Sequence, residues 1–428
     1  MSRNEQIIGE APTRLARKLP AGMVDTALAS LATFAIGITA ANLLNAKDLG
    51  VYAVFFTAFM FGTVLPRNLI FTPSEVTAVA RPIAERMKLL TQSVRLGLLL
   101  ALIGASAVFI AAAITMSKTD PEVLTALIVT TGIATVLSPV QDHIRKMFHI
   151  ADHSWLAAAV STVHVIVAGV SVGVMILADV PAPWIPFGAL AIANTVSLCV
   201  AWVLAMRVGA SGGEPRLHLR DLLSFGKWLV FQASVPSIAG FVVAAVIVRL
   251  AGLEVLGYAE AARIVAQPVI VLASGLTAVL APRAMEASMA VNLDGAKRLR
   301  RIYLTLVVIA GVGYLAIAGT SWVLNPMAYL VPAAYVVPGL VALTVVMNTF
   351  GAAEFLQVNE ILAARREKTL TMISILTSPI VIIVAFTAAS TEAFARPLGG
   401  LFESWARLAA QGRLLRHHYA QDSPEPHS

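Results

Sequence analysis

The chain has 428 residues, of which 58% are hydrophobic and only 13% are charged, with a mean hydropathy of +0.81 and a formal net charge of +7. Soluble domains carry about a quarter charged residues, so this composition excludes an ordinary soluble domain and predicts an all-α polytopic membrane protein. The single cysteine, Cys199, lies in an apolar run, which excludes a disulfide framework and a cysteine-based metal site.

The chain starts with a basic segment, residues 1–20, which contains four Lys or Arg residues and precedes an apolar run over residues 21–44. This run is too long for the apolar part of a signal peptide, and no convincing cleavage site follows it. We therefore expect it to be a retained first membrane helix.

Twelve apolar runs are long enough to cross the hydrocarbon core of a bilayer, which takes about 20 helical residues. Six lie before the midpoint of the chain and six after it. We expect helices over residues 21–44, 50–72, 93–115, 122–141, 155–178, 185–206, 228–250, 256–281, 302–324, 334–357, 370–389 and 393–410.

The last of these runs is the least apolar. It contains Arg396, Glu403 and Arg407, and charged side chains are costly in contact with lipid. Two interpretations remain open: a twelfth membrane helix, or an amphipathic helix on the membrane surface, which would leave eleven spans.

The polar breaks between the runs alternate between strongly and weakly basic. The strongly basic ones are the two termini and the breaks near residues 81–88, 145–146, 207–227, 283–301 and 365–368, whereas the others hold only Lys47, Lys118, Arg249 and Arg396. Because Lys and Arg gather in cytoplasmic loops, both termini are expected in the cytoplasm, which requires an even number of helices. Topology accounts for the net charge, so we expect no nucleic-acid partner.

The longest polar break divides the chain into two halves of similar size. We expect a cytoplasmic N-terminus over residues 1–20, an N-lobe over 21–206, a cytoplasmic linker over 207–227, a C-lobe over 228–410 and a cytoplasmic tail over 411–428. Gly209, Gly212 and Gly213 in the linker favour a flexible tether between the lobes.

Landmarks of the first half recur about 210 residues later. Leu49-Gly50-Val51-Tyr52 follows the first helix and Leu256-Gly257-Tyr258 follows the seventh; Pro73 corresponds to Pro282, and Asp142 to Glu354. Six helices per copy is an even number, so both copies run in the same sense. We expect two six-helix lobes related by a pseudo-two-fold axis along the membrane normal, with a central cleft between them.

Several segments carry a resemblance to a known family. They are Tyr258-Ala-Glu-Ala261-Ala-Arg-Ile264 opening the eighth helix, Pro139-Val-Gln-Asp142-His-Ile-Arg145 ending the fourth, and the stretch from Pro326 through Tyr335 to Pro338. With the six-plus-six helices, they resemble the polysaccharide (oligosaccharide-lipid) flippases of the multidrug/oligosaccharidyl-lipid/polysaccharide exporter (MOP) superfamily. One departure is that these flippases often have an acid before the Arg ending the seventh helix, where this chain has Val248 before Arg249.

The resemblance implies a flippase that moves an undecaprenyl-pyrophosphate-linked oligosaccharide across a bacterial cytoplasmic membrane for polysaccharide export. It implies alternating access by rocking of the lobes, with the lipid-linked glycan, membrane lipids and other polysaccharide-assembly proteins as partners. No cofactor is expected, and the chain has no G-x-x-x-x-G-K-[ST] nucleotide loop, so an ion gradient or the membrane potential would supply the energy.

Four arginines are candidates for binding the pyrophosphate and glycan, because a guanidinium offers paired donors to phosphate oxygens. Arg263 and Arg67 lie inside predicted helices, where a charge faces a wet cavity or a partner. Their alternative role is snorkelling to the interface or pairing with an acid such as Glu260. Arg249 and Arg145 lie closer to the membrane surfaces, where anchoring or orientation is the alternative.

Three acids inside predicted helices are candidates for ion coupling: Asp25, Glu354 and Glu260. Each could instead form a structural ion pair.

The sequence gives little indication of an enzyme, and we expect no catalytic residue and no metal site. His143, His149 and His153 are adjacent to cationic residues, and we interpret them as a solvated helix end. His164 is isolated within the fifth helix; such a histidine is more often a hydrogen-bonded core residue, although a membrane acyltransferase would need one.

Three alternatives to a flippase remain: a multidrug exporter of the same superfamily, which is expected to have a more acidic cleft for cationic drugs; a membrane glycan polymerase or acyltransferase; and a non-transporting scaffold of a glycan assembly complex.

Overall fold

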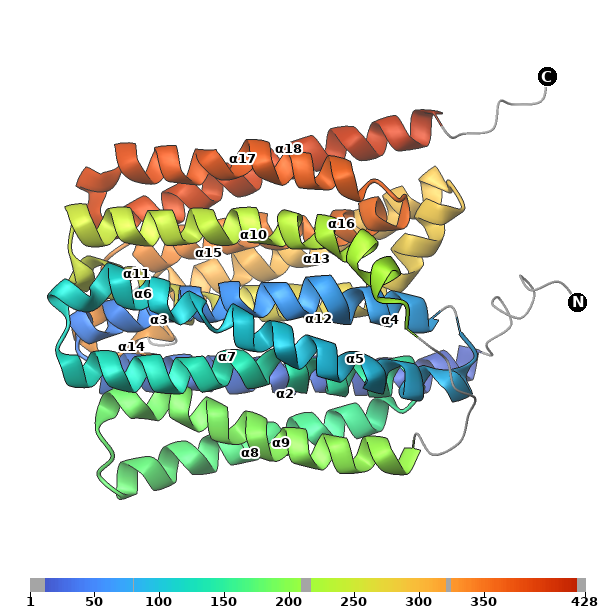
Figure 1. Cartoon of the computed structure of the whole chain (residues 1–428). Coiled ribbons are helices and arrows are strands. Elements are labelled where there is room, and N and C mark those ends of the chain that lie inside the picture. Colours follow the sequence, from blue (N-terminus) through green and yellow to red (C-terminus); the bar gives the residue numbers. More distant parts are fainter. Residues whose placement is uncertain (1–11, 80, 209–216, 321–324, 422–428) are drawn as a thin grey trace, which may run out of the picture.

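A computed structural model describes residues 12–79, 81–208, 217–320 and 325–421, and in these residues the chain is an elongated bundle of helices (Figure 1). Helix after helix runs the length of the bundle and turns back, as expected when apolar segments of at least 20 residues satisfy their own backbone hydrogen bonds. The protein therefore has the fold of an all-α polytopic membrane protein.

The first half of the chain makes six passages along the bundle. Their elements are α2 (Pro12–Leu43); α3 (Ala46–Pro66), η1 (Arg67–Phe71) and α4 (Thr72–Val79); α5 (Ile83–Gly104), α6 (Ala107–Thr115) and η2 (Met116–Lys118); α7 (Pro121–Ile150); α8 (Ser154–Leu177); and η3 (Ala182–Trp184) with α9 (Ile185–Val208).

The second half makes six more. Their elements are α10 (Leu219–Leu250); α11 (Leu253–Val265) and α12 (Gln267–Met289); α13 (Leu293–Ala318); α15 (Leu340–Ala353) and α16 (Phe355–Ala363), preceded by the short turns α14 (Met327–Leu330) and η4 (Ala333–Tyr335); α17 (Glu367–Thr387); and η5 (Ala389–Phe394) with α18 (Ala395–Gln421).

Most of these passages meet the length and hydropathy of a membrane span. Among the described residues ten helices qualify by length and composition, and the pair α11 and α12, bent by 43°, makes an eleventh. The charged α18 does not qualify, yet it packs along α17 and α15 and runs through the bundle with them (Figure 1). It therefore belongs to the second lobe rather than lying across it, which agrees with the first of the two interpretations of this segment.

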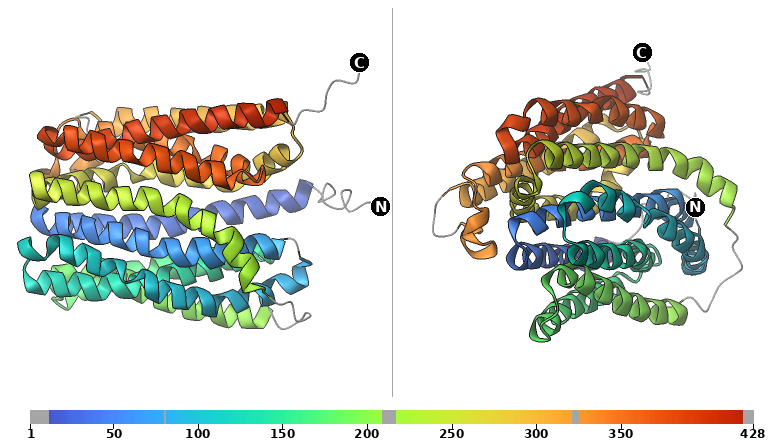
Figure 2. Two further views of the ribbon diagram at one scale, coloured as in Figure 1. Left: turned by 45° about the horizontal axis from the view of Figure 1, so that its top comes forward. Right: turned by 60° about the vertical axis from the view of Figure 1, so that its left-hand side comes forward.

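The packing repeats in the two halves. In the first half α2 packs on α8, α8 on α9 and α7 on α9; in the second half the corresponding pairs are α10 with α17, α17 with α18 and α15 with α18. Figure 2 shows the helices of the first half, coloured blue to green, on one side and those of the second half, yellow to red, on the other. The predicted two lobes and their pseudo-two-fold relation are thus confirmed.

The lobes meet where α3 packs against α11. A Cβ added at Gly50 would collide with the carbonyl oxygen of Leu253, and one added at Gly257 would collide with that of Ala46. Both glycines lie at the same offset within the repeat, 207 residues apart, and so do Ala46 and Leu253. Such a reciprocal contact is what a two-fold axis produces, which places the axis between α3 and α11.

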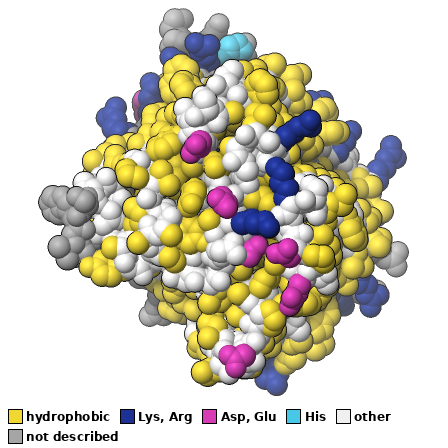
Figure 3. Space-filling model, turned by 90° about the vertical axis from the view of Figure 1, so that its left-hand side faces the viewer, with side chains coloured by type: hydrophobic (Ala, Val, Ile, Leu, Met, Phe, Trp, Pro, Cys, Tyr) yellow, Lys and Arg dark blue, Asp and Glu magenta, His cyan; other side chains and the backbone are white. Residues whose placement is uncertain are grey.

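The two ends of the bundle differ in charge. The basic end is the one toward which the described chain begins and finishes, and residues 81–88, 207–208, 217–219, 290–301 and 364–368 lie there (Figure 1). Figure 3 looks onto the opposite end, where charged side chains of both signs lie among apolar and uncharged ones. The described residues thus show the asymmetry expected of a membrane protein oriented by its cations.

Contacts between the lobes close the opposite end. Besides the glycine contact, Asn42 donates a hydrogen bond to the carbonyl oxygen of Leu330 (2.8 Å), and the Tyr335 hydroxyl donates one to the carbonyl oxygen of Leu44. The Lys118 ammonium donates to the carbonyl oxygen of Val248 at 2.6 Å. Each of these bonds joins a residue of the first half to one of the second.

The element boundaries differ from the sequence-based ones at several places. α7 continues to Ile150 rather than ending at residue 141, α10 begins at Leu219 within the expected linker, and α18 continues to Gln421 into the expected tail. The sequence-based bounds follow the apolar runs. A helix depends on backbone hydrogen bonds, which polar residues also form, so these helices continue beyond the apolar runs. The linker glycines 209, 212 and 213 lie outside the described residues, and the lobe boundaries remain predictions.

Candidate functional site

Three adjoining cavities form a cleft between the lobes. The first, about 340 Å³, includes Thr33 of α2, Arg263 of α11 and Asn348 of α15 in its lining. The second, about 230 Å³, shares Thr33 and Gln267 with it and reaches Arg145 of α7. The third, about 680 Å³, lies between α2 and the pair α12 and α13. These adjoining cavities are called the inter-lobe cleft below.

Arg263 and Arg396 share one carboxylate in this cleft. The Arg263 guanidinium donates two hydrogen bonds to Glu260, one turn earlier on α11, at 2.6 and 2.9 Å. Arg396, at the start of α18, donates to the same carboxylate at 3.3 Å. The Arg263 guanidinium also lies 4.3 Å from the centre of the Phe56 ring on α3. Phe56 and Arg263 occupy the same repeat position, so this contact also lies near the pseudo-two-fold axis.

This three-residue group, called the Glu260 cluster, carries an excess positive charge. The Glu260 side chain is fully buried, whereas the side chains of Arg263 and Arg396 are 22% and 26% exposed. Both arginines line the 340 Å³ cavity. Two guanidiniums balanced by one carboxylate leave about one positive charge at the cavity wall, and partial exposure leaves donors free to bind an anion.

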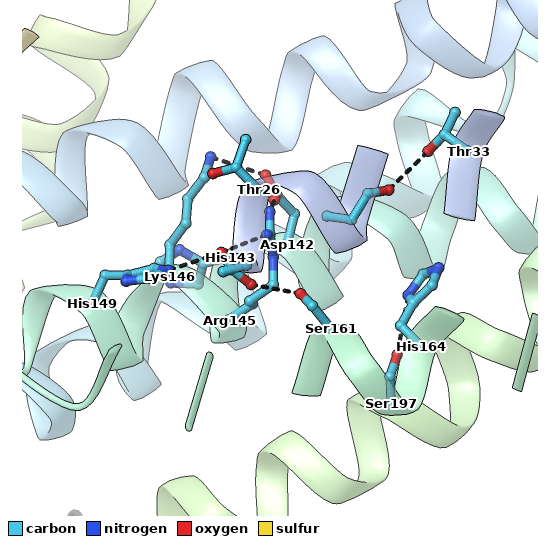
Figure 4. Close-up of polar contacts among 12 residues, drawn as sticks. Thr26, Thr33, Asp142, His143, Arg145, Lys146, His149, Ser161, His164 and Ser197 are labelled. Carbon is cyan, nitrogen blue, oxygen red and sulfur yellow. Dashed lines mark hydrogen bonds and ion pairs between the residues drawn. The ribbon is translucent and has the colours of Figure 1, made fainter. Parts of the chain in front are cut away.

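A second ionic group lies inside the N-lobe around Asp25, and Figure 4 labels its other members, Arg145, His149 and Ser161. The buried Asp25 carboxylate accepts hydrogen bonds from Arg145 (2.7 Å), His149 (2.8 Å) and Ser161 (2.5 Å). Because Arg145 and His149 are on α7 and Ser161 is on α8, this single carboxylate joins α2 to two other helices. Arg145 also lines the 230 Å³ cavity, so the group reaches the inter-lobe cleft.

Asp142 extends this group along α7. It forms ion pairs with Arg145 at 2.5 Å and with Lys146 at 2.9 Å. Arg67 is exposed in η1, a π-helical turn directly after Pro66 that packs against α7. The Arg67 side chain has no hydrogen bond or ion pair with another described residue. π-helical turns are frequent at functional sites, and this one leaves a free guanidinium near the N-lobe group.

The interpretation of His143 and His149 as a solvated helix end is wrong. His143 is buried, stacks on Phe71 with ring centres 4.1 Å apart, and is hydrogen-bonded to Glu75 and Ser93 at 2.8 Å each. His149 is bonded to Asp25. The error arises because α7 continues past residue 141 inside the lobe, so its polar end packs against α4 and α5 instead of facing solvent.

The largest of the three cavities is apolar. Its lining includes Leu31 and Phe34 of α2, Leu272 of α12, and Leu306 and Ile309 of α13. The pseudo-symmetric counterpart of this side, where η1 meets α10, is packed instead, because a Cβ added at Gly226 would lie 2.6 Å from the carbonyl oxygen of Leu69. In the described residues, the α2 side therefore has an apolar space next to the cleft, whereas its counterpart is filled by the contact between η1 and α10.

Glu354 has a structural partner. Its carboxylate pairs with Arg407 of α18 at 3.0 Å and accepts a hydrogen bond from Gln411 at 3.1 Å. Arg407 also pairs with Glu403, which accepts a bond from Ser378 of α17 at 2.9 Å. Glu354 thus joins α18 to the junction of α15 and α16.

Arg249 and His164 lie apart from these groups. Arg249 is exposed in the last turn of α10 at the opposite end. His164 is buried in α8, and its Nδ1 is hydrogen-bonded to the Ser197 hydroxyl at 3.4 Å (Figure 4). In the described residues, no group of three or more His, Cys, Asp or Glu side chains could hold a metal ion.

Arg396 was not among the residues predicted from the sequence to lie in the cleft. Its charge inside an apolar segment was noticed as a cost, but not as a sign of a buried partner. The usable signal was the coincidence of a lone acid in one helix, Glu260, and a lone arginine in another, since charges at membrane depth usually face each other or a cavity.

Comparison with known proteins supports the fold. No protein-family model and no curated protein matches the sequence. A solved structure described as the inward-facing conformation of a multidrug resistance MATE family transporter of the MOP superfamily is similar, with a TM-score of 0.70 and 13% identity over 92% of this chain and 96% of that one. An outward-facing conformation of such a transporter gives 0.68 and 13% over 96% of both chains.

A third similar structure, a MATE protein in complex with MaD3S, gives a TM-score of 0.64 at 14% identity over 98% of this chain and 100% of that one. The likeness spans nearly the whole of every chain compared. The protein therefore has the fold of the MATE transporters, with two lobes around a central cleft.

Proposed function

We propose that this protein is an alternating-access transporter that flips a lipid-linked oligosaccharide, carried on a pyrophosphate such as that of undecaprenyl, across a bacterial cytoplasmic membrane for polysaccharide export. The observation that carries the proposal is the composition of the inter-lobe cleft. An excess of guanidinium charge at the Glu260 cluster adjoins an apolar cavity of about 680 Å³.

The Glu260 cluster supports an anionic cargo. Arg263 and Arg396 present partly exposed guanidiniums to the cavity, and planar guanidiniums bind phosphate oxygens in pairs. Arg145 lies farther along the same cleft, toward the basic end. The pyrophosphate would bind between the Glu260 cluster and Arg145. Arg67 and Arg249, exposed elsewhere, would act in capture or anchoring.

The apolar cavity supports a cargo with a lipid tail. Its walls come from both lobes, and it lies on the side where α2 faces α12 and α13. A polyprenyl chain placed there keeps its contact with apolar side chains while the phosphate reaches the Glu260 cluster. A soluble sugar phosphate would gain nothing from this wall.

The closed end of the cleft supports alternating access. The lobes meet at the opposite end through the glycine contact and hydrogen bonds, while the cavities extend from there toward the basic end. If the cations orient the basic end toward the cytoplasm, this conformation faces the cytoplasm. We propose that rocking of the lobes breaks these contacts, and that an ion gradient drives it through Asp25, which joins α2 to α7 and α8.

The multidrug exporter alternative fits the structural comparisons equally well. The charge of the cleft favours the flippase, because a cationic drug needs an excess of acids and the described wall has more guanidinium than carboxylate. The structure disfavours a glycan polymerase or acyltransferase, because His164, the candidate catalytic histidine, is buried in the N-lobe beside Ser197. A scaffold role would leave the cleft without a purpose.

The proposal is tested with purified protein in liposomes that contain a fluorescent lipid-linked pyrophosphate oligosaccharide. Flipping is measured as the loss of label that a membrane-impermeant quencher can reach. The double variant Arg263→Ala/Arg396→Ala should lose flipping, because the phosphate loses both guanidiniums at the cavity wall. Arg283→Ala, an exposed arginine on α12, is the matched control and should retain it.

Full activity of the double variant would contradict the assignment of the site. Efflux of cationic dyes by the wild-type protein, without flipping of the pyrophosphate lipid, would instead establish the exporter alternative.

A further inference from the structure

A cavity with two cationic side chains in its lining lies outside the inter-lobe cleft, on the N-lobe toward the basic end. Its volume is about 540 Å³, and it lies between α5 and α9. Lys88, Thr91, Gln92 and Arg95 line it from α5, and Trp202, Ala205 and Met206 line it from α9. The cargo path proposed above does not include it.

The two cations of this cavity have no acidic partner in the part of the chain that the structure describes. Neither Lys88 nor Arg95 forms an ion pair or a side-chain hydrogen bond with another described residue, and Arg95 is exposed. Lys88, Thr91 or Gln92, and Arg95 recur every three or four residues, so they share one face of α5. Two unpaired cations on one helix face form a site of positive potential.

The same face of α5 continues as an apolar stripe. Leu98, Leu99 and Leu102 follow Arg95 at helical spacing and are 41%, 59% and 57% exposed. Residues 96–115 contain no ionisable side chain and cover about 30 Å as helix, the thickness of the hydrocarbon core. Arg95 therefore lies at the edge of the hydrocarbon, and Lys88 lies two turns farther out, at the level of the headgroups.

The position of Trp202 agrees with a placement of this cavity at the membrane interface. Its amphipathic ring lies about two turns from the end of α9, where tryptophans gather at the membrane interface. Ala205, one turn on, is buried and leaves room between the helices.

We propose that this cavity binds the phosphate of an anionic phospholipid from the leaflet at the basic end, with Lys88 and Arg95 around the headgroup and the acyl chains along Leu99 and Leu102. The exposed apolar stripe favours a lipid over free phosphate, because only a lipid covers both parts of the α5 face. The proposal does not depend on the identity of the transported cargo.

Native mass spectrometry of the full chain in detergent tests this site, with phosphatidylglycerol and phosphatidylcholine as probes. The wild-type protein should retain phosphatidylglycerol more tightly than the zwitterionic lipid. Lys88→Gln/Arg95→Gln should bind phosphatidylglycerol about thirtyfold more weakly, the effect of two cations near a headgroup. Lys88→Arg/Arg95→Lys keeps both charges and should bind like the wild type.

The matched control is Arg298→Gln/Arg301→Gln, which removes two exposed cations of α13 toward the same end. It should bind phosphatidylglycerol like the wild type; an equal loss in both glutamine variants would overturn the site in favour of general surface charge. Displacement of the lipid by inorganic phosphate alone would overturn the assignment to a lipid. Equal retention of the two lipids by the wild type would overturn the assignment to an anion.

Discussion

At the scale of single residues, Glu260 holds the charge of the cleft together. It is fully buried and binds both Arg263 and Arg396. Removal of one member of a buried ion pair leaves the partner's charge without compensation, which typically destabilises a protein by about 3–5 kcal/mol. Glu260 has two partners to leave uncompensated, whereas each arginine has one.

We therefore expect Glu260→Gln to lower the thermal stability of the purified protein more than Arg396→Gln does, because Arg263 keeps its carboxylate in the second variant. The measurement is the unfolding temperature in detergent by intrinsic fluorescence. Arg301→Gln, an exposed arginine of α13, should leave the temperature nearly unchanged. The opposite order of the first two variants would show that Glu260 is not what stabilises the two guanidiniums.

Asp25 is the second residue with a distinct expectation. Its buried carboxylate has three hydrogen-bond partners on α7 and α8. Binding of a proton or a sodium ion to this carboxylate would change these bonds, and the position of α2 would change with them. Asp25→Asn keeps the size of the side chain and removes the charge. We expect flipping by this variant to become independent of an imposed proton or sodium gradient.

The measurement compares initial flipping rates in liposomes with and without the gradient. Asp221→Asn, an exposed acid near the start of α10, has the same change of charge and should retain the dependence. If flipping by Asp25→Asn still depends on the gradient, Asp25 does not couple the ion to transport. Glu260 would then be the next candidate for ion coupling.

How much of the site could be read from the sequence depends on separation along the chain. Arg263 and Glu260 are three residues apart on one helix, so their pairing was foreseeable. Arg396 is 136 residues from Glu260, and only the fold brings it there. The partners of Asp25 lie 120 or more residues away and were not foreseeable either. Sequence reasoning selected the ionisable residues and missed most of their partners.

At the scale of elements, the contact between α3 and α11 decides how the lobes close. Gly50 and Gly257 let the two helices approach until a Cβ on either would collide with the carbonyl oxygen of the other helix. We expect Gly50→Ala and Gly257→Ala to separate the lobes at the end of the bundle opposite the basic end. The protein should then shift toward the conformation in which that end is open. Overpacking of this kind costs about 1–3 kcal/mol.

The shift is measured as increased labelling of Cys introduced at Asn42, which is hydrogen-bonded across the lobes in this conformation, by an impermeant thiol reagent in a Cys199→Ser background. Gly313→Ala is the control, because a Cβ there meets open space on α13. Labelling equal to that of the control would mean that the two helices adjust without opening.

The helix α18 shows why composition misjudges some elements. A hydropathy profile treats Arg396, Glu403 and Arg407 as costs, since it assumes contact with lipid. In the structure each of them binds a polar group of its own lobe: Glu260, Ser378 and Glu354. The number of helices and the duplication were predictable because they depend on runs and repeats, whereas the role of α18 depends on which helices surround it.

At the scale of the whole molecule, the two lobes form one closed end and one cleft. The closed end is joined by hydrogen bonds between residues far apart in sequence, such as Asn42 with Leu330 and Tyr335 with Leu44. In an alternating-access cycle these bonds must break once per turnover, because the cargo leaves through that end. A covalent link across it should therefore stop transport without disturbing the fold.

We expect Asn42→Cys/Leu330→Cys, in a Cys199→Ser background, to lose flipping after treatment with a short bifunctional thiol reagent cleaved by reduction, and to regain it after reduction. Thr320→Cys/Asn325→Cys is the matched control, because these residues also lie at the opposite end and are hydrogen-bonded within one lobe. The cross-linked control should flip lipid at its normal rate. If the Asn42/Leu330 pair is fully cross-linked and flipping continues, then the cargo does not pass between the lobes at this end, and rocking of the two lobes is not the transport mechanism.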